Sequence, residues 1–439
     1  MIDAHGIGGQ SDLPIPLELA VSGAVAALVL SFAVLVLAWR RPRYATLDTS
    51  HGSRVPPLLS RVVLAPYTKV ALRVLGFLLF LFTAACAVFG VEELTNPFFG
   101  IVYIWWWVGL VFASLLLGPV WKAISPVRTI NDVLQRLTGG DGERGIRDYP
   151  ARLGLWPAAF GLYAFVWLEL VYERSDELAD VRLWCALYVA AMLIGGAVYG
   201  SRFYENADPF EVYSSLVARL SPWHVVDDRI VLRSPLANLA GTPPKPGLVA
   251  VVAVLFGSTA FDSFSESAYW NGVIYDATLT GNQLNNLALL AFCLAAGLLF
   301  AGGCALTGVG EGVRRRDLPR RFAHSIVPIV AGYIVAHYLT LFVDFGTQTL
   351  AQASDPFGRG WDVLGTASLS PSYWFSYHPT LLATIKVLAV VAGHVTAAVA
   401  AHDRALEVLP RQHQVTGQLP LLVTMVGFTA GGLYLLFSA

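Results

Sequence analysis

The sequence predicts an all-α integral membrane protein with about ten transmembrane helices. Only 13% of its 439 residues are charged and 56% are hydrophobic, whereas a soluble domain carries about 25% charged residues. Apolar runs of about 20 residues, the length that crosses the hydrocarbon core of a bilayer, recur along the whole chain. Basic residues gather in alternate connections between these runs. Together these observations favour a multi-pass membrane protein and exclude a soluble globule, a disordered chain and a coiled coil.

Ten runs have the length and composition of a membrane-spanning helix. They cover residues 16–39, 69–91, 98–120, 152–172, 181–200, 246–262, 284–308, 322–345, 378–400 and 418–438. The run at 246–262 is the shortest, and we expect Pro246 to open it, because proline is favoured at the first helical position.

The distribution of Lys and Arg predicts the orientation of these spans. Five connections hold 25 of the 29 basic residues, and they are 40–73, 122–152, 202–245, 314–321 and 404–411. The positive-inside rule places these connections in the cytoplasm. Both termini then lie outside, which requires an even number of spans and agrees with ten. We therefore expect a multi-pass protein of the cytoplasmic membrane in contact with lipid.

Composition also excludes several partners. The formal net charge is −1 and the basic residues are dispersed, which argues against nucleic-acid binding. The four cysteines all lie in apolar runs with no CxxC spacing, so neither a disulfide framework nor a cysteine-based metal site is expected. The chain as a whole, residues 1–439, is interpreted as a single polytopic membrane domain.

Two stretches resemble each other at a spacing of 83 residues, Trp121–Leu137 and Tyr204–Leu220. Each places Ser or Asp before a proline and then about three turns of amphipathic helix. Ser125 and Asp208 are the expected N-caps. The internal repeat therefore covers residues 69–137 and 152–220, a parallel duplication of the hairpins formed by spans 2–3 and 4–5. Each hairpin would be followed by an amphipathic helix on the inner leaflet.

The five-span C-terminal half, residues 246–439, carries ionisable groups at membrane depth. Such groups cost several kcal/mol unless they are paired or hydrated, so each is a candidate site. Tyr333, His337 and Asp344 lie on one face of the span at 322–345, and Lys386 lies at a similar depth to His337 in the next span. We predict an outward-facing catalytic or transport site from these four residues.

A metal site is one chemistry that this half could support. His337, Asp344, His378, Asp262 and His5 are the candidate ligands, since imidazole and carboxylate suit zinc or copper. The ligands would have to converge from separate helices, because no HxxxH or HExxH pattern occurs. A haem is disfavoured, because the two deep histidines, His337 and His394, lie at different levels.

Other interpretations use the same residues. In a proton-coupled or metal transporter, Asp344, Lys386 and His337 would relay protons or bind ions beside a cavity for a small apolar or ionic ligand. In a scaffold or assembly subunit they would be structural: Lys386 could extend its amine towards the outer surface or pair with Asp344. Asp262 and His378 could be outer-surface residues.

Several segments of the chain resemble a family of polytopic actinobacterial membrane proteins commonly labelled fenitrothion hydrolase. The similarity covers most of the chain and is carried by His5-Gly-Ile-Gly-Gly9, Asp12-Leu-Pro-Ile-Pro16, Gly257-Ser-Thr-Ala-Phe-Asp262, Pro328…Tyr333…Ala336-His337-Tyr338 and Gly393-His394…Ala401-His402-Asp403-Arg404. The resemblance implies a membrane-embedded hydrolase of organophosphorus or related esters. In such an enzyme a metal-activated hydroxide would attack, and Lys386 would neutralise the leaving oxygen. Enzymatic activity rests on this resemblance alone.

Overall fold

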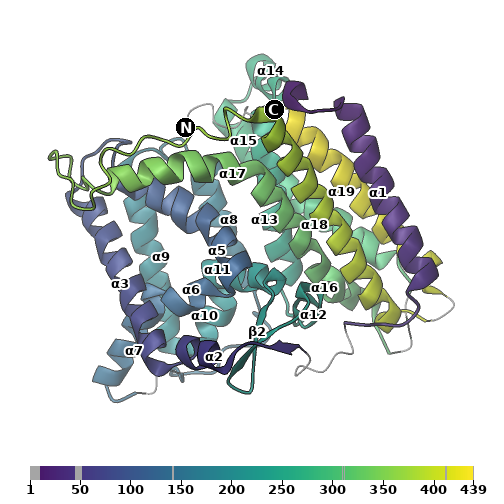
Figure 1. The fold of residues 1–439 in the computed structure, drawn as a ribbon, viewed down its shortest axis with the longest axis horizontal. Coiled ribbons are helices and arrows are strands. Elements are labelled where there is room, and N and C mark those ends of the chain that lie inside the picture. Colours follow the sequence, from purple (N-terminus) through teal and green to yellow (C-terminus); the bar gives the residue numbers. More distant parts are fainter. Residues whose placement is uncertain are drawn as a thin grey trace. The chain divides into compact units, whose positions relative to one another are not determined.

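The computed structural model describes residues 10–44, 52–140, 143–308, 310, 312–410 and 413–438. The chain forms two compact units. The first contains residues 1–51, 234–340 and 373–439, and the second contains residues 52–233 and 341–372. Figure 1 shows the helices from which both are built. The long helix α17 (Val327–Gln352) begins in the first unit, and its last turns belong to the second.

Besides the start of α17, the first unit has five long helices joined by short ones. The long helices are α1 (Leu17–Ala38), α13 (Leu248–Ser265), α15 (Gly281–Ala305), α18 (Pro379–Val408) and α19 (Leu419–Ser438). The short helices are η1 (Gln10–Asp12), α12 (Pro235–Ala240), α14 (Ala268–Asp276), η4 (Arg315–Asp317), α16 (Leu318–Phe322), η5 (Ala323–Ile326) and η7 (Thr416–Gln418).

The second unit combines helices with a small antiparallel sheet. Its helices are α2 (Pro57–Val63), α3 (Pro66–Phe89), α4 (Pro97–Phe99), the π-helix η2 (Gly100–Val108), α5 (Gly109–Leu117), α6 (Val120–Ile124), α7 (Pro126–Leu137), α8 (Trp156–Leu170), α9 (Leu178–Tyr199), α10 (Ser201–Ala207), α11 (Pro209–Val217) and η3 (Ala218–Leu220). Strands β1 (Ser53–Arg54), β2 (Trp223–Val226) and β3 (Arg229–Leu232) pair in the order β1-β3-β2. Val225 faces Ile230 across the hairpin, whose two-residue turn is Asp227–Asp228 with positive φ at both positions.

The predicted all-α polytopic fold is confirmed. Each of the ten predicted spans overlaps a helical segment, although α17 ends seven residues and α18 eight residues beyond the predicted span. Within the described residues, nine segments are long and apolar enough to cross a membrane. The tenth, α8, has only 15 residues, because Val171 ends it before it reaches full membrane length.

The two repeated helices begin as predicted but differ in their surroundings. The side chain of Ser125 accepts a hydrogen bond from the Arg128 amide, and that of Asp208 accepts one from the Phe210 amide, so both residues are N-caps. Helix α7 has one buried and one exposed face, as expected of an amphipathic helix. Helix α11 is different, because eight of its nine residues are buried. It is a core helix of the second unit instead of a helix lying on a membrane surface.

The core of the first unit lies where α1, α17, α18 and α19 meet. Figure 1 shows α1, α18 and α19 side by side, and the three pack on one another. Buried side chains of this core include Ala24, Tyr333, Val390 and Leu433. Small residues permit the close contact between α17 and α18: a Cβ atom at Gly393 would lie 2.5 Å from the carbonyl oxygen of Pro328. Spans 8 and 9 are therefore in direct backbone contact.

Two polar residues near the end of α18 hold the segment that follows α1. His402 is buried, with its Nδ1 3.0 Å from Gln418 Oε1 and its Nε2 2.9 Å from the Trp39 carbonyl oxygen. The neighbouring Asp403 carboxylate accepts hydrogen bonds from the backbone amides of Arg43 and Tyr44. His402 thus connects α18 through hydrogen bonds to Trp39, which follows α1, and to Gln418, which precedes α19.

The contact at Gly393 predicts a specific stability difference. Gly393→Ala should destabilise the protein by about 1–3 kcal/mol, because its new methyl group meets backbone that cannot move aside. Gly431→Ala is the matched control, since a Cβ atom there meets nothing within 4 Å. Alanine should be neutral or slightly stabilising at Gly431. Thermal unfolding in detergent measures both, and equal midpoints for the two variants would contradict the prediction.

Candidate functional site

Polar side chains of α13 and α17 meet inside the first unit. Asp262 and Ser263 are consecutive on α13, while Tyr333, His337 and Tyr338 lie on α17. All five are buried, with exposed fractions between 1% for Ser263 and 6% for His337. We call this set the α13–α17 polar chain. It joins the predicted site residues Tyr333 and His337 to Asp262, one of the proposed metal ligands.

The five side chains form a continuous series of hydrogen bonds. His337 lies in the middle, with its Nε2 2.8 Å from Asp262 Oδ2 and its Nδ1 3.2 Å from Ser263 Oγ. At one end the Tyr338 hydroxyl donates to the same Asp262 oxygen at 2.6 Å. At the other end the Tyr333 hydroxyl donates to Ser263 Oγ at 2.9 Å. Two adjacent residues of one helix thus hold both nitrogens of a single imidazole ring.

The chemistry of these groups orients the hydrogens along the chain. An ionised Asp262 can only accept, so His337 donates to it from Nε2 and leaves Nδ1 as an acceptor. Ser263 then donates to Nδ1 and accepts from Tyr333. Every hydrogen in the series Tyr333–Ser263–His337 consequently points towards Asp262. Such an arrangement can pass a proton from Tyr333 to Asp262, or can withdraw a proton from the Ser263 hydroxyl.

Lys386 lies at the same end of the first unit as the last turn of α13. It is buried on α18, and the carboxylates whose charge acts on it are Asp12 and Glu266. Glu266 is four residues beyond Asp262, about one helical turn or 6 Å along the axis. A second layer of charge, made by Lys386, Asp12 and Glu266, therefore lies next to the α13–α17 polar chain. The sequence interpretation paired Lys386 with Asp344 and did not consider Asp12 or Glu266.

The remaining predicted site residues are not members of this hydrogen-bonded cluster. Asp344 belongs to the part of α17 in the second unit, where it is buried, and its Oδ1 has no hydrogen-bond partner among the described residues. His378 is exposed at the start of α18, with its ring stacked on Trp374 and its Nδ1 2.8 Å from the Trp374 carbonyl oxygen. His5 lies outside the described residues.

The proposed metal site therefore has few assembled ligands. Of the five candidates, the structure brings Asp262 and His337 into contact. Across the described ranges of the chain, no group of three or more His, Cys, Asp and Glu side chains has the geometry to hold a metal ion. A tightly bound zinc or copper ion needs at least three protein ligands. The metal site stays a prediction that depends on residues such as His5.

A further histidine lies near the same helix contact. His394 follows Gly393, the residue of α18 that packs against Pro328 and Gly332 of α17. Its Nδ1 is 2.8 Å from the Val390 carbonyl oxygen, and its buried Nε2 has no hydrogen-bond partner in the part of the chain that the structure describes. Gly332 precedes Tyr333, so His394 lies close to the Tyr333 end of the polar chain. Among the described residues, its Nε2 is thus a buried nitrogen that no other group satisfies.

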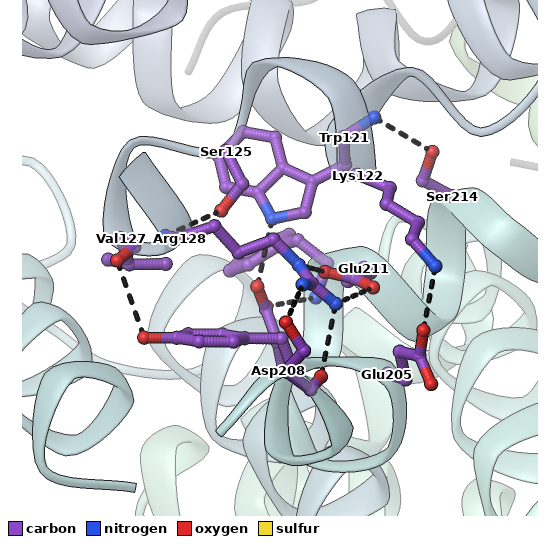
Figure 2. A network of polar contacts seen from close by, with 12 residues as sticks. Trp121, Lys122, Ser125, Val127, Arg128, Glu205, Asp208, Glu211 and Ser214 are labelled. Carbon is purple, nitrogen blue, oxygen red and sulfur yellow. Dashed lines mark hydrogen bonds and ion pairs between the residues drawn. The ribbon is translucent and has the colours of Figure 1, made fainter. Parts of the chain in front are cut away.

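The second unit contains a separate buried network that the sequence interpretation missed. Figure 2 shows the Arg128 guanidinium pointing at Glu211 and the Trp121 indole at Asp208. Arg128 bonds Glu211 through Nε at 2.5 Å and through a terminal nitrogen at 2.7 Å, and also contacts Ser201. Asp208 accepts hydrogen bonds from Trp121, Tyr188 and the Phe210 amide at 2.9–3.0 Å. We call these residues the Arg128–Asp208 network.

The electrostatics of the network favour a charged Arg128 and raise the pKa of Asp208. Burial acts against the charged guanidinium, but hydrogen bonding to Glu211 and its charge raise the pKa of Arg128 above the usual value. Burial, followed by the nearby charge of Glu211, raises the pKa of Asp208 to about 7, against three hydrogen bonds that lower it. Asp208 is thus the group of this network that titrates near neutral pH.

The spacing of the repeat contains the signal that would have revealed this network. Arg128 and Glu211 are 83 residues apart, and so are Lys122 and Glu205, whose side chains form an exposed ion pair of 2.7 Å. In both of these pairs a basic residue of the first copy contacts its own counterpart in the second. When a residue contacts its own counterpart in a second copy, both residues lie beside the two-fold axis that relates the copies. A two-fold axis along the membrane normal also keeps both copies in the same orientation, as in a parallel repeat.

The two ion pairs at the repeat spacing should differ strongly in importance. Arg128→Met leaves the Glu211 carboxylate buried without its partner and should cost about 3–5 kcal/mol of stability. Lys122→Met is the matched control, because its ion pair is exposed and should contribute no more than about 1 kcal/mol. Thermal unfolding of the two variants beside the wild type measures the difference. A Lys122→Met effect as large as that of Arg128→Met would refute this ranking.

Comparison of the chain with protein-family models, with curated proteins and with solved structures finds no match. The function of this multi-pass membrane protein is therefore inferred from its own residues and their contacts.

Proposed function

We propose that this protein is a proton-coupled membrane transporter and that the Asp262–His337 pair carries the proton. The hydrogen-bond series from Tyr333 through Ser263 and His337 to Asp262 is the observation that supports this function. Ionisable groups buried in membrane helices are costly, and they mark proton relays and ion pathways. Histidine suits this role, because its charge changes near physiological pH.

The surroundings of the pair favour proton transfer over chemistry on a large substrate. Asp262, Ser263 and His337 are each more than 90% buried, so a proton reaches them more readily than a bulky ester does. The adjacent charges of Lys386, Asp12 and Glu266 would exchange protons with the outer side. At the other end, His394 offers a buried nitrogen without a protein partner in the described residues, one helix contact away from Tyr333.

Proton flux into proteoliposomes tests the proposal, with the proton itself as the probe. A membrane potential is imposed with potassium and valinomycin, and an internal pH-sensitive dye reports proton entry. Asp262→Asn should reduce the flux at least tenfold, because an amide cannot accept the proton from His337. Asp276→Asn is the control, since Asp276 is exposed at the end of α14.

Two results would count against this function. Wild-type protein that moves no more protons than empty liposomes would remove the basis for proton coupling. Equal flux through wild type and Asp262→Asn would assign the movement to another route. His337→Ala provides an independent check, because it removes the ring that connects Ser263 to Asp262.

A hydrolase is the second candidate, and one observation favours it. Ser263, His337 and Asp262 form a hydroxyl–imidazole–carboxylate series, the order of groups that activates a serine nucleophile. The resemblance to the family labelled fenitrothion hydrolase implies organophosphorus esters as substrates. Ser263 Oγ would attack phosphorus and expel the leaving oxygen, while the hydroxyl proton passes to His337 Nδ1. This version needs no metal ion, but it requires an opening to Ser263, which is 1% exposed.

A fluorophosphonate probe distinguishes the two functions. An activated serine forms a phosphorus–oxygen bond with the probe and releases fluoride. If the hydrolase proposal holds, the wild type is labelled at Ser263, and both Ser263→Ala and His337→Ala abolish labelling. A transporter leaves Ser263 unlabelled, because the residue is buried and serves only as a hydrogen-bond bridge. Absence of label in the folded wild type therefore eliminates the serine mechanism.

A further inference from the structure

The second unit contains a large apolar cavity, and the residues that line it all belong to that unit. Its volume is about 980 Å³, at the upper end of the range of about 300–1,000 Å³ for small-molecule sites. Helices α3 and α9, the π-helix η2 and helix α5 form its walls, and α6 forms its floor. Leu79, Phe82, Ile101, Leu110 and Val189 are typical of its lining. We call it the α3–α9 chamber.

The chamber lies along the C-terminal half of α3, between two close contacts of this part of the chain. Near the middle of α3, Gly76 allows close contact with α6, since a Cβ atom there would lie 1.8 Å from the Ile124 carbonyl oxygen. At the C-terminal end the buried Asn96 donates to the carbonyl oxygens of Cys86 and Val91 at 3.0 Å. Between Gly76 and Cys86 no residue of α3 is fully buried. This segment of α3 is thus the outer wall of the chamber.

The dimensions of the chamber match a lipid chain. The α3 residues that line it run from Leu75 to Val88, which at 1.5 Å per residue is roughly 20 Å. The hydrocarbon core of a bilayer is about 30 Å thick. The chamber therefore extends through more than half of that thickness, parallel to helices that cross it.

The two ends of the chamber differ in polarity. At the floor, Trp121 and Tyr188 line the chamber, and both donate their polar hydrogens away to Asp208. At the other end lies Arg182, which donates to the Ala87 carbonyl oxygen at 2.9 Å. Within the described ranges, Arg182 forms no ion pair with a carboxylate. One end thus presents a cation and the other an apolar surface.

An occupant of the chamber is expected on physical grounds. Apolar cavities do not retain water, because water there loses its hydrogen bonds. The chamber is partly open to its surroundings, so an acyl chain of the bilayer can enter it and supply the apolar contacts that its lining lacks. A membrane supplies acyl chains at high concentration.

We propose that the α3–α9 chamber binds a membrane phospholipid with an anionic head group. Its acyl chain fills the space between α3 and α9, and its phosphate pairs with Arg182 at the mouth. The phospholipid stabilises α3 against the rest of the second unit. This binding site is independent of the α13–α17 polar chain, and either can exist without the other.

Native mass spectrometry of the full-length protein tests the proposal. The protein is first delipidated in non-ionic detergent and then incubated with equimolar phosphatidylglycerol and phosphatidylcholine. Wild type should retain one phosphatidylglycerol molecule per chain. Ala186→Trp fills the chamber from α9 and should lower retention at least fivefold. Leu187→Trp is the matched control, because the neighbouring Leu187 is 62% exposed and does not line the chamber. Ala113→Trp, from the opposite wall, repeats the test should Ala186→Trp fold poorly.

A separate variant tests whether Arg182 selects the anionic head group. Arg182→Gln should retain phospholipid but bind phosphatidylglycerol and phosphatidylcholine equally. Retention that is unchanged in both tryptophan variants, or a wild type that retains no lipid, would overturn the chamber as a binding site. A retained fatty acid in place of phospholipid would overturn the assignment of the occupant. Melting temperatures of all variants, measured without added lipid, separate lost binding from lost folding.

Discussion

The absence of water inside a bilayer governs how this protein handles its polar groups. A hydrogen-bonding group in the hydrocarbon region needs a protein partner, because no water can replace one. The first unit meets this requirement by placing Asp262 and Ser263 on either side of the His337 ring. The second unit satisfies buried polar groups in the same way outside its predicted spans: Asp208 is surrounded by three donors, and Arg128 contacts Glu211 and Ser201. In each unit one helix with its N-cap supplies two polar residues, α13 in the first unit and α11 in the second. Side chains of neighbouring helices form hydrogen bonds with these residues.

Satisfied networks of this kind specify structure more than they add stability. A buried ion pair is roughly neutral in free energy when it is compared with a well-packed apolar pair, whereas the loss of one partner is costly. Arg128 and Glu211 therefore define which helices of the second unit may meet. The same reasoning applies to His337 and Asp262, which belong in addition to a continuous series of hydrogen bonds from Tyr333 to Asp262. That series makes the first unit the better candidate for proton chemistry.

Much of the fold could be predicted because membrane spans are a property of local sequence. Runs of apolar residues identified the helices. Ser125 and Asp208, each followed by proline, identified two N-caps, because capping involves residues only two or three positions apart. The burial of α11 could not be foreseen, because its Pro209–Val217 stretch carries polar residues whose partners lie on other helices. Helix α8 was expected to be longer, because hydrophobicity does not reveal where Val171 ends the hydrogen-bonded turns.

The candidate site was harder to predict than the helices. Tyr333 and His337 are one turn apart on α17, so their common face follows from sequence. Ser263 was overlooked because serine is common in membrane helices, and only the position of α13 beside α17 gives it a role. For Lys386, depth in the membrane suggested Asp344 as a partner, but depth does not determine which side of a helix faces a neighbour. Its charged neighbours, Asp12 and Glu266, come from elements distant in sequence.

The ion pairs at the repeat spacing also constrain how the two copies can associate. Lys122 and Arg128 belong to the first copy, and their partners Glu205 and Glu211 occupy the same positions in the second. If the first copy associated with another first copy, lysine would face lysine and arginine would face arginine. If the second copy associated with another second copy, glutamate would face glutamate at both positions. Only the mixed pair is neutral. Expressed as two polypeptides, the halves should accordingly prefer each other to themselves.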